Sequence, residues 1–122
     1  MLAGRLRERV RFDRRVIVAD DGYGNEVAGW ATFVGPVAAE ISPMRSREQA
    51  LAAKLEERNV VEITVRWQPV LAGLTDGVAA LGNADRAVDA RTGKVYDIHV
   101  VDNKDLRKRY LTVLAESGGA IG

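Results

Sequence analysis

The sequence predicts a mainly β protein: a small antiparallel β-barrel or sandwich, with one short inserted helix and a long apolar loop. Several segments alternate between apolar and polar residues, as strands with one buried face do. Turn signals rich in Gly, Asp and Asn separate these segments at short intervals. A length of 122 residues suits one domain over residues 1–122.

The first third of the chain predicts two strands joined by a turn. Residues 8–19 begin with arginines that alternate with valine and phenylalanine, and a β-branched run follows. Residues 20–25 combine glycines with Asp and Asn, which accept the positive φ values of a tight turn. The second strand spans residues 28–41, with a bend at Gly35-Pro36 because proline cannot donate to a central ladder.

The middle of the chain combines a helix signal with an apolar stretch that has no firm period. Ser46 and Gln49 form a capping-box pattern, and the alanines and leucines after them predict a helix over residues 46–58. Residues 70–83 are apolar and punctuated by glycines, so we expect a long loop with at most one helical turn. A loop of this length in a small domain usually has a function.

The remaining strands complete a pattern of about six. The cleanest alternation is that of residues 61–67, and a turn at residues 91–94 joins two segments as a hairpin. The later strands are residues 85–90, 95–101 and 110–114. At the two ends we expect an N-terminal arm, residues 1–7, and a flexible C-terminal tail, residues 116–122.

Composition excludes several classes of function. The chain has no cysteine, which excludes disulfides, thiolate metal sites and a cysteine nucleophile. Its net charge of +1 is far below that of most sequence-independent nucleic-acid binders. No stretch approaches the roughly 20 apolar residues of a membrane helix, so no membrane association is expected. The N-terminal arginines have no apolar run behind them, so we expect no secretory signal.

The residues offer no convincing catalytic site. His99 is the single histidine, and we interpret it as a packed or solvent-facing strand residue, since no second histidine or cysteine completes a zinc or nucleophile site. Carboxylate pairs fall in expected turns or at the helix end: Asp20/Asp21, Glu56/Glu57 and Asp102/Asp105. We therefore expect no enzyme, no cofactor and no metal. Trp30 and Trp67 are expected to pack in the core, with subunit contact as the alternative.

Arginines alternate along the N-terminal segment and would form a basic stripe on one face of a strand. Such a stripe is either a solvated face or a contact with an acidic protein partner or with passing DNA. Leucines in the preceding arm could anchor it on a neighbour. The candidate partner or inter-subunit contacts are therefore Leu2, Arg5, Leu6, Arg7, Arg9 and Arg11.

In their order along the chain, these features resemble the phage head–tail joining (head-closure or stopper) proteins of tailed phages, prophages and gene transfer agents. The opening Gly4 to Arg9 is similar to the segment that begins the first strand of that family. The resemblance continues through the turn Asp21-Gly22-Tyr23-Gly24-Asn25 with Trp30, the strand Val37 to Ile41, the helix with Arg47 and Glu48, the strand Val61 to Trp67, the hairpin with Gly93 and Tyr96-Asp97-Ile98, and Arg109-Tyr110-Leu111. It covers nearly the whole chain. The family's tryptophan is replaced by Ala38, and the stretch 70–83 is longer than expected.

The resemblance implies a non-enzymatic β-barrel subunit of a homo-oligomeric ring, expected to be dodecameric, in the neck of a virion or phage-like particle assembled in the bacterial cytoplasm. Its implied partners are the portal or adaptor on the head side, a tail terminator or tail tube protein on the tail side, and double-stranded DNA in the lumen. The long loop then becomes a candidate for axial or lumen contacts through Leu71, Leu74, Val78 and Leu81. A nucleic-acid-binding β-barrel module is the alternative, since it would use the arginines and aromatics.

Overall fold

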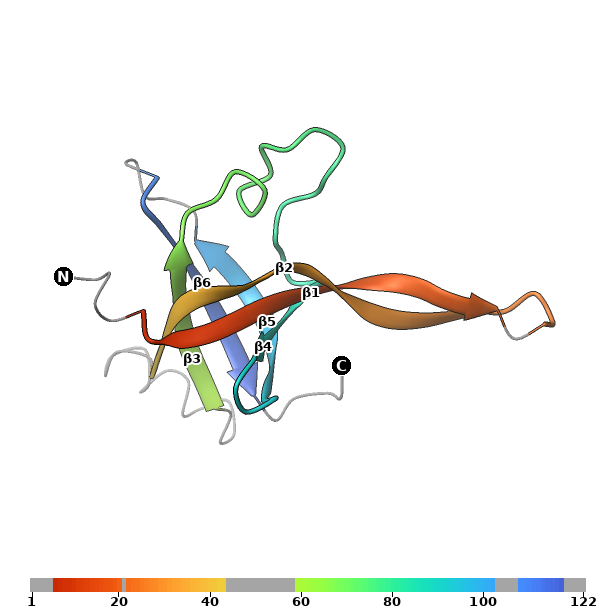
Figure 1. Ribbon diagram of the computed structural model, residues 1–122, viewed down its shortest axis with the longest axis horizontal. Helices are drawn as coiled ribbons and strands as arrows, with labels where there is room; N and C mark the ends of the chain where they lie inside the picture. The colour runs from red at the N-terminus through yellow and green to blue at the C-terminus, as the bar shows by residue number, and fades with distance from the viewer. Residues whose placement is uncertain (1–5, 21, 44–58, 103–107, 118–122) are drawn as a thin grey trace.

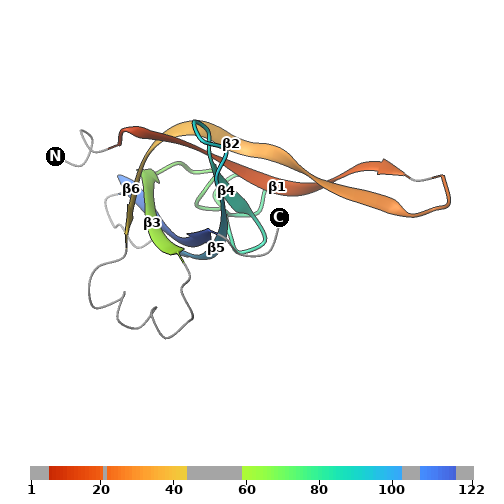
Figure 2. The ribbon, with the colours of Figure 1, turned by 90° about the horizontal axis from the view of Figure 1, so that it is seen from below.

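A computed structural model describes residues 6–20, 22–43, 59–102 and 108–117, and over these residues the chain forms six β-strands. The strands are β1 (Glu8–Asp20), β2 (Glu26–Pro43), β3 (Asn59–Arg66), β4 (Arg86–Asp89), β5 (Val95–Asp102) and β6 (Tyr110–Ser117). Every pairing is antiparallel, and the pairing of β1 with β4 closes the sheet into a barrel in the order β1-β2-β3-β6-β5-β4 (Figures 1 and 2). The predicted antiparallel β-barrel is confirmed.

The barrel core follows directly from the alternation in the sequence. Successive side chains of a strand point to opposite faces, so every second residue points into the barrel. Among the fully buried side chains are Val10 and Phe12 of β1, Ile63 of β3, and Leu111 and Val113 of β6. Each large apolar side chain buried in this way stabilises the fold by about 1.5–3 kcal/mol relative to exposure.

The long loop between β3 and β4 has no regular strand or helix and is fixed to the barrel at two points. Leu71 is fully buried and Leu81 is 4% exposed, and both belong to the core cluster. The Leu81 amide donates to the Leu71 carbonyl oxygen at 3.1 Å, which closes the loop upon itself. The predicted loop over residues 70–83 is thus confirmed.

The structure bears differently on the predicted helix and on the predicted chain ends. The expected helix over residues 46–58 lies outside the described residues, as do residues 1–5 of the N-terminal arm and residues 118–122 of the tail. The start of the predicted tail at residue 116 is corrected, because β6 continues through Ser117. Ser117 pairs with Asn59 of β3 and with Tyr96 of β5, so the strand is held on both sides to its last residue.

The strands β1 and β2 are much longer than the barrel requires. They have 13 and 18 residues, whereas the other four strands have 4 to 8. β4 pairs with β1 only from Val10 to Asp13, and β3 pairs with β2 only from Ala39 to Pro43. Beyond Asp13 each strand has only the other as its partner, and together they project from the barrel as a two-stranded hairpin (Figures 1 and 2).

The bend predicted at Gly35-Pro36 is present within β2. The pairing register between β1 and β2 shifts there, since Val10 pairs with Val37 but Phe12 pairs with Val34. Gly35 has a φ of +119°, and a Cβ atom at this position would lie 2.8 Å from the Arg11 Cα atom. Only glycine combines this φ value with so close an approach of two backbones.

Candidate functional site

The end of the projecting hairpin, which we call the distal hairpin (residues 16–31), exposes apolar residues. The exposed fractions of Ile17, Val18 and Val27 are 60%, 57% and 44%, and that of Tyr23 in the turn is 88%. Ile17 pairs with Ala28, whereas Val18 packs over Gly29, the next residue of β2, so the two side chains lie on opposite faces of the hairpin. Apolar side chains on both faces of an isolated two-stranded ribbon indicate that other protein surfaces cover it.

A glycine allows the two strands of the distal hairpin to pack closely. A Cβ atom at Gly29 would lie 2.8 Å from Val18 Cγ1, so the valine occupies the space that a side chain would fill. Val18 therefore lies over the backbone of β2 and remains 57% exposed on its outer side. The close pairing of the two backbones at Gly29 therefore leaves the outer side of Val18 as apolar surface on this face.

The charge of the distal hairpin is acidic. No lysine or arginine occurs from residue 16 to residue 44, whereas Glu26 is exposed near the end of the hairpin. Asp20 pairs with Glu26 at the last rung of the ladder.

The neck of the hairpin, where β1 and β2 leave the barrel, is built on two buried carboxylates. The first is Asp13, whose side chain is 3% exposed. Arg11 Nε donates to Asp13 Oδ1 at 3.0 Å, and Arg86 Nε of β4 donates to Asp13 Oδ2 at 3.1 Å. Because both carboxylate oxygens have an arginine partner, the charge can be buried at the barrel edge.

The second buried carboxylate, Asp85, connects the long loop to the hairpin. Arg14 donates to it through Nε at 2.8 Å and through one terminal nitrogen at 2.9 Å, a bidentate ion pair. Arg14 also donates to the carbonyl oxygens of Ala79 and Ala80, both at 3.0 Å. The hydrogen bond to Asp85 raises the pKa of Arg14, against a smaller effect of burial. One arginine thus fixes the loop against the base of the hairpin.

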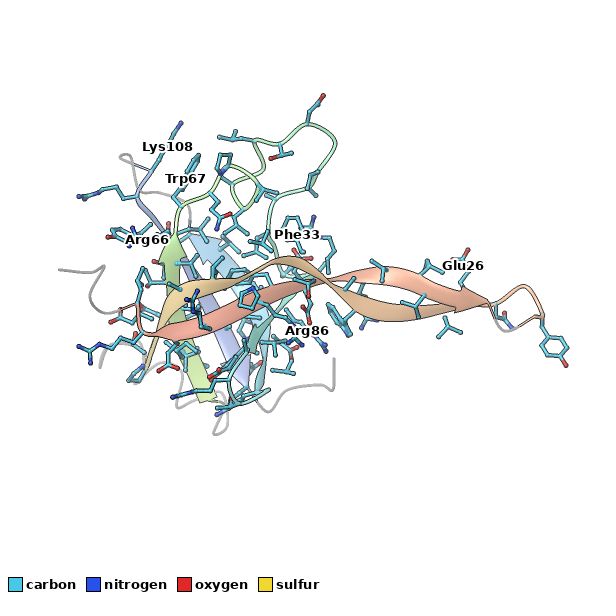
Figure 3. All side chains as sticks on the ribbon, in the orientation of Figure 1. Glu26, Phe33, Arg66, Trp67, Arg86 and Lys108 are labelled. Atoms are coloured by element: carbon cyan, nitrogen blue, oxygen red, sulfur yellow. The ribbon has the colours of Figure 1, made fainter. Side chains whose placement is uncertain are left out.

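Aromatic rings in the neck are covered by arginines. The Arg14 guanidinium lies 3.6 Å from the centre of the Phe33 ring, and those of Arg86 and Arg15 lie 4.4 Å and 4.7 Å from the Trp30 ring centre. Phe33 and Arg86 lie at the base of the hairpin, and Glu26 lies near its far end (Figure 3). Trp30 is outside the core cluster, so its predicted core position is wrong, whereas Trp67 packs against the core as expected.

An open pocket lies where β1 begins, at the other end of this strand from the hairpin turn. It has a volume of about 530 Å³ and is lined by Arg9, Pro36, Ala90 and Arg91. The Ala90 amide donates to the Arg9 carbonyl oxygen at 2.9 Å, which fixes the β4–β5 turn against β1. An exposed ion pair of 3.2 Å joins Arg91 to Glu8 at the rim. The pocket therefore has a mainly apolar floor and two arginines around it.

The titratable groups form no obvious reaction centre in the described part of the chain. His99 Nε2 lies 3.0 Å from Glu116 Oε1 on the outer surface of β5 and β6, which agrees with a solvent-facing strand residue. Burial raises the pKa of Tyr96, and the nearby Asp89 and Glu8 add to this effect. Within the described ranges, no three His, Asp or Glu side chains group as metal ligands, and no helix is long and apolar enough to cross a membrane.

The predicted arm contacts are only partly available to a partner. Leu6 is 8% exposed and packs in its own chain, and Arg11 pairs with Asp13, whereas Arg7 and Arg9 are exposed. Leu2 and Arg5 lie outside the described residues.

The predicted loop contacts divide in the same way. Leu71 and Leu81 hold the loop on the barrel, Val78 is half-buried, and Leu74 is 62% exposed. Leu74 is therefore the apolar residue of this set that can reach a partner without rearrangement.

The sequence interpretation missed the distal hairpin as an interaction surface. Ile17, Val18, Tyr23 and Val27 were not among the candidate contacts. Two signals could have identified them. The run Val16-Ile17-Val18 does not alternate, so it has no polar face, and the two strands are longer than a small barrel can accommodate.

Comparison with known proteins identifies the family. The model of the phage head completion protein family matches residues 1–118. The chain belongs to this family. It is therefore a structural protein of a phage or phage-like particle, which agrees with the resemblance and with the expected location in a virion. A search of curated proteins gave no match.

Solved structures share the fold of this head completion protein. Protein SF1141 from Shigella flexneri 2a is 20% identical, with a TM-score of 0.65 over 99% of this chain and 100% of that chain. A chain in the virion of a native gene transfer agent particle is 22% identical, with a TM-score of 0.50 over 88% of this chain and 90% of that chain.

Proposed function

We propose that this head completion protein is a head–tail connector subunit of the head-closure, or stopper, type. Copies of it form a homo-oligomeric ring, expected to be dodecameric, between the portal or adaptor of the DNA-filled capsid and the tail. The ring joins the two parts and helps to retain or pass the DNA. The role needs no catalytic residue, because it consists of contacts with neighbours.

The observation that carries this proposal is the distal hairpin. It is apolar on both faces and has an exposed tyrosine at its end, while its own barrel lies at the other end of the ribbon. A subunit that extends such an element must place it on a neighbour. If the hairpin of each copy binds a different surface on the next copy, the same contact can repeat from copy to copy. Such a repeated contact closes into a ring when the rotation between neighbouring copies allows it.

The alternative, a nucleic-acid-binding β-barrel, has less support in the side chains. A single-strand-binding surface needs arginines along a groove and aromatic rings open to bases. Here Arg11, Arg14 and Arg86 pair with buried carboxylates, and arginines cover the rings of Phe33 and Trp30. DNA in the lumen of a ring would be contacted through phosphates without sequence preference.

Two further contacts belong to the same proposal. The long loop, with exposed Leu74, would meet the adaptor, the tail or the lumen. The N-terminal segment, with exposed Arg7 and Arg9, would contribute to an axial or lateral contact with an acidic surface. Removal of residues 1–6, or of part of residues 73–82, should then impair tail attachment or DNA retention.

Electron microscopy of particles from the native source, with this protein located by difference between wild-type and deletion particles, tests the proposal. We expect a ring between portal and tail in the wild type. Without the protein we expect DNA-filled heads without tails, or heads that have lost their DNA. Particles with normal necks and tails in the deletion strain would exclude the connector function.

A further inference from the structure

The acidic end of the hairpin and the arginine-rimmed pocket lie at opposite ends of the same strand. Arg9 is the second residue of β1, and the hairpin turn follows Asp20, its last residue. At about 3.3 Å per residue, the two surfaces are roughly 35 Å apart. The hairpin of one chain therefore cannot reach the pocket of the same chain.

We propose that the hairpin end of one copy docks into the pocket of a second copy, with Tyr23 inserted between Arg9 and Arg91. This inference rests on the proposed ring and names the two surfaces that meet between neighbouring subunits. It makes the ring contact heterologous, because one surface is the hairpin end and the other is the start of β1 with the β4–β5 turn.

Charge complementarity selects a second copy as the occupant. The hairpin end carries exposed Glu26 and no basic residue from 16 to 44, and the pocket rim carries Arg9 and Arg91. The ion pair between Arg91 and Glu8 is exposed, and such pairs contribute little, so Arg91 can exchange it for an incoming carboxylate.

The shapes and polarities of the two surfaces also agree. Tyr23 is 88% exposed at the turn, and tyrosine is among the residues that most often dominate the affinity of an interface. The pocket, at about 530 Å³, has room for an aromatic ring and offers Pro36 and Ala90 as apolar contacts. Docking the turn also brings the two-sided apolar ribbon of Ile17 and Val18 against a neighbouring barrel.

Cross-linking in assembled particles tests the contact, since the chain has no natural cysteine. The variant Tyr23→Cys/Ala90→Cys, treated with a short bismaleimide, should give a ladder of covalent multimers of this chain. Each single variant and the pair Leu74→Cys/Ala90→Cys serve as controls and should remain monomeric. A ring visible at the neck without a ladder would overturn the docking while leaving the connector function intact. Absence of the protein from particles would overturn both, and cross-links to another protein would overturn the docking.

Charge reversal provides a second test that does not alter Tyr23. Glu26→Arg and Arg91→Glu, each alone, should lower the yield of tailed particles at least about tenfold, since a lost or reversed interfacial charge pair typically has effects of that order. The double variant should recover most of the yield. Circular dichroism of each purified chain controls for folding. If both single variants assemble normally, or the double variant is no better than the singles, the proposed pairing is wrong.

Discussion

The neck and the distal half of the β1–β2 hairpin are parts of the same two strands, yet they are stabilised differently. In the neck, the side chains of Asp13, Arg14 and Phe33 each have a partner within the chain. In the distal half, Ile17, Val18 and Tyr23 remain more than half exposed. The contacts of these neck residues are therefore satisfied within the folded chain itself. The exposure of the distal half agrees with the proposed contact with a neighbouring copy.

This difference separates stability from assembly. Changes in the neck should unfold or loosen the monomer, because they leave buried charges without partners. Changes in the distal hairpin should leave the monomer folded and affect only the particle. A variant of the distal hairpin that unfolds the barrel, or a neck variant that leaves its stability unchanged, would break the distinction.

The largest effect is expected for Arg14→Ala in the neck. The change leaves Asp85, which is 4% exposed, without its bidentate partner and removes the hydrogen bonds to two loop carbonyls. We expect the free energy of unfolding to fall by about 3–5 kcal/mol, measured by urea denaturation. Arg15→Ala is the matched control, because Arg15 contributes a cation–π contact with Trp30 and should cost less than about 1 kcal/mol. Equal losses for the two variants would contradict the role of Asp85.

The next effect concerns the long loop, where two leucines three residues apart have different environments. Leu71 is fully buried and Leu74 is 62% exposed. Leu71→Ala should lower the free energy of unfolding by about 2–5 kcal/mol, whereas Leu74→Ala should change it by less than about 0.5 kcal/mol. Urea denaturation of the two variants measures both. If Leu74→Ala were the more destabilising change, the loop would not be fixed to the barrel as described.

Much of the barrel could be predicted from the sequence, because its strands alternate and each turn has its own signal. The strands of residues 61–67 and 95–101 were located to within two residues, since one face of each is buried and the period-two pattern is visible. The pairing of β1 with β4 could not be predicted, because closure depends on contacts between residues about 75 positions apart, such as Phe12 and Ala87.

The candidate site was harder to predict for a related reason. The exposed or buried position of a leucine in residues 70–83 depends on how the loop lies on the barrel, and no periodicity encodes this. The alternating arginines Arg5, Arg7, Arg9 and Arg11 were interpreted as one basic stripe, but Arg11 has a buried carboxylate two residues away. Arg14, outside that stripe, has a buried carboxylate 71 residues away. Pattern alone does not distinguish an arginine that binds a partner from one that binds its own chain.

A third prediction addresses assembly through the two faces of the distal hairpin. Ile17→Ser and Val18→Ser replace exposed apolar side chains on opposite faces. Each should leave the free energy of unfolding within about 0.5 kcal/mol of the wild type but lower the yield of tailed particles about tenfold or more. Val100→Ser, which changes a 56% exposed valine on the barrel, is the matched control and should assemble normally. An effect from only one of the two faces would show that neighbours cover the hairpin on that side alone.

The smallest effect is expected at alkaline pH and reports on the barrel alone. Burial and the nearby Asp89 and Glu8 raise the pKa of Tyr96, so the folded chain holds this proton more tightly than the unfolded chain does. The resulting stability is fully present below the pKa of an unfolded tyrosine, about 10, and is lost as the pH rises through the pKa of the folded state. Tyr96→Phe should therefore lose less stability than the wild type between about pH 9.5 and 11 when both are unfolded in urea. The two proteins differ only in the hydroxyl of residue 96, so the contributions of all other groups cancel in the difference. Parallel pH profiles for the two proteins would show that the Tyr96 hydroxyl is not in the buried, acidic environment that the barrel gives it.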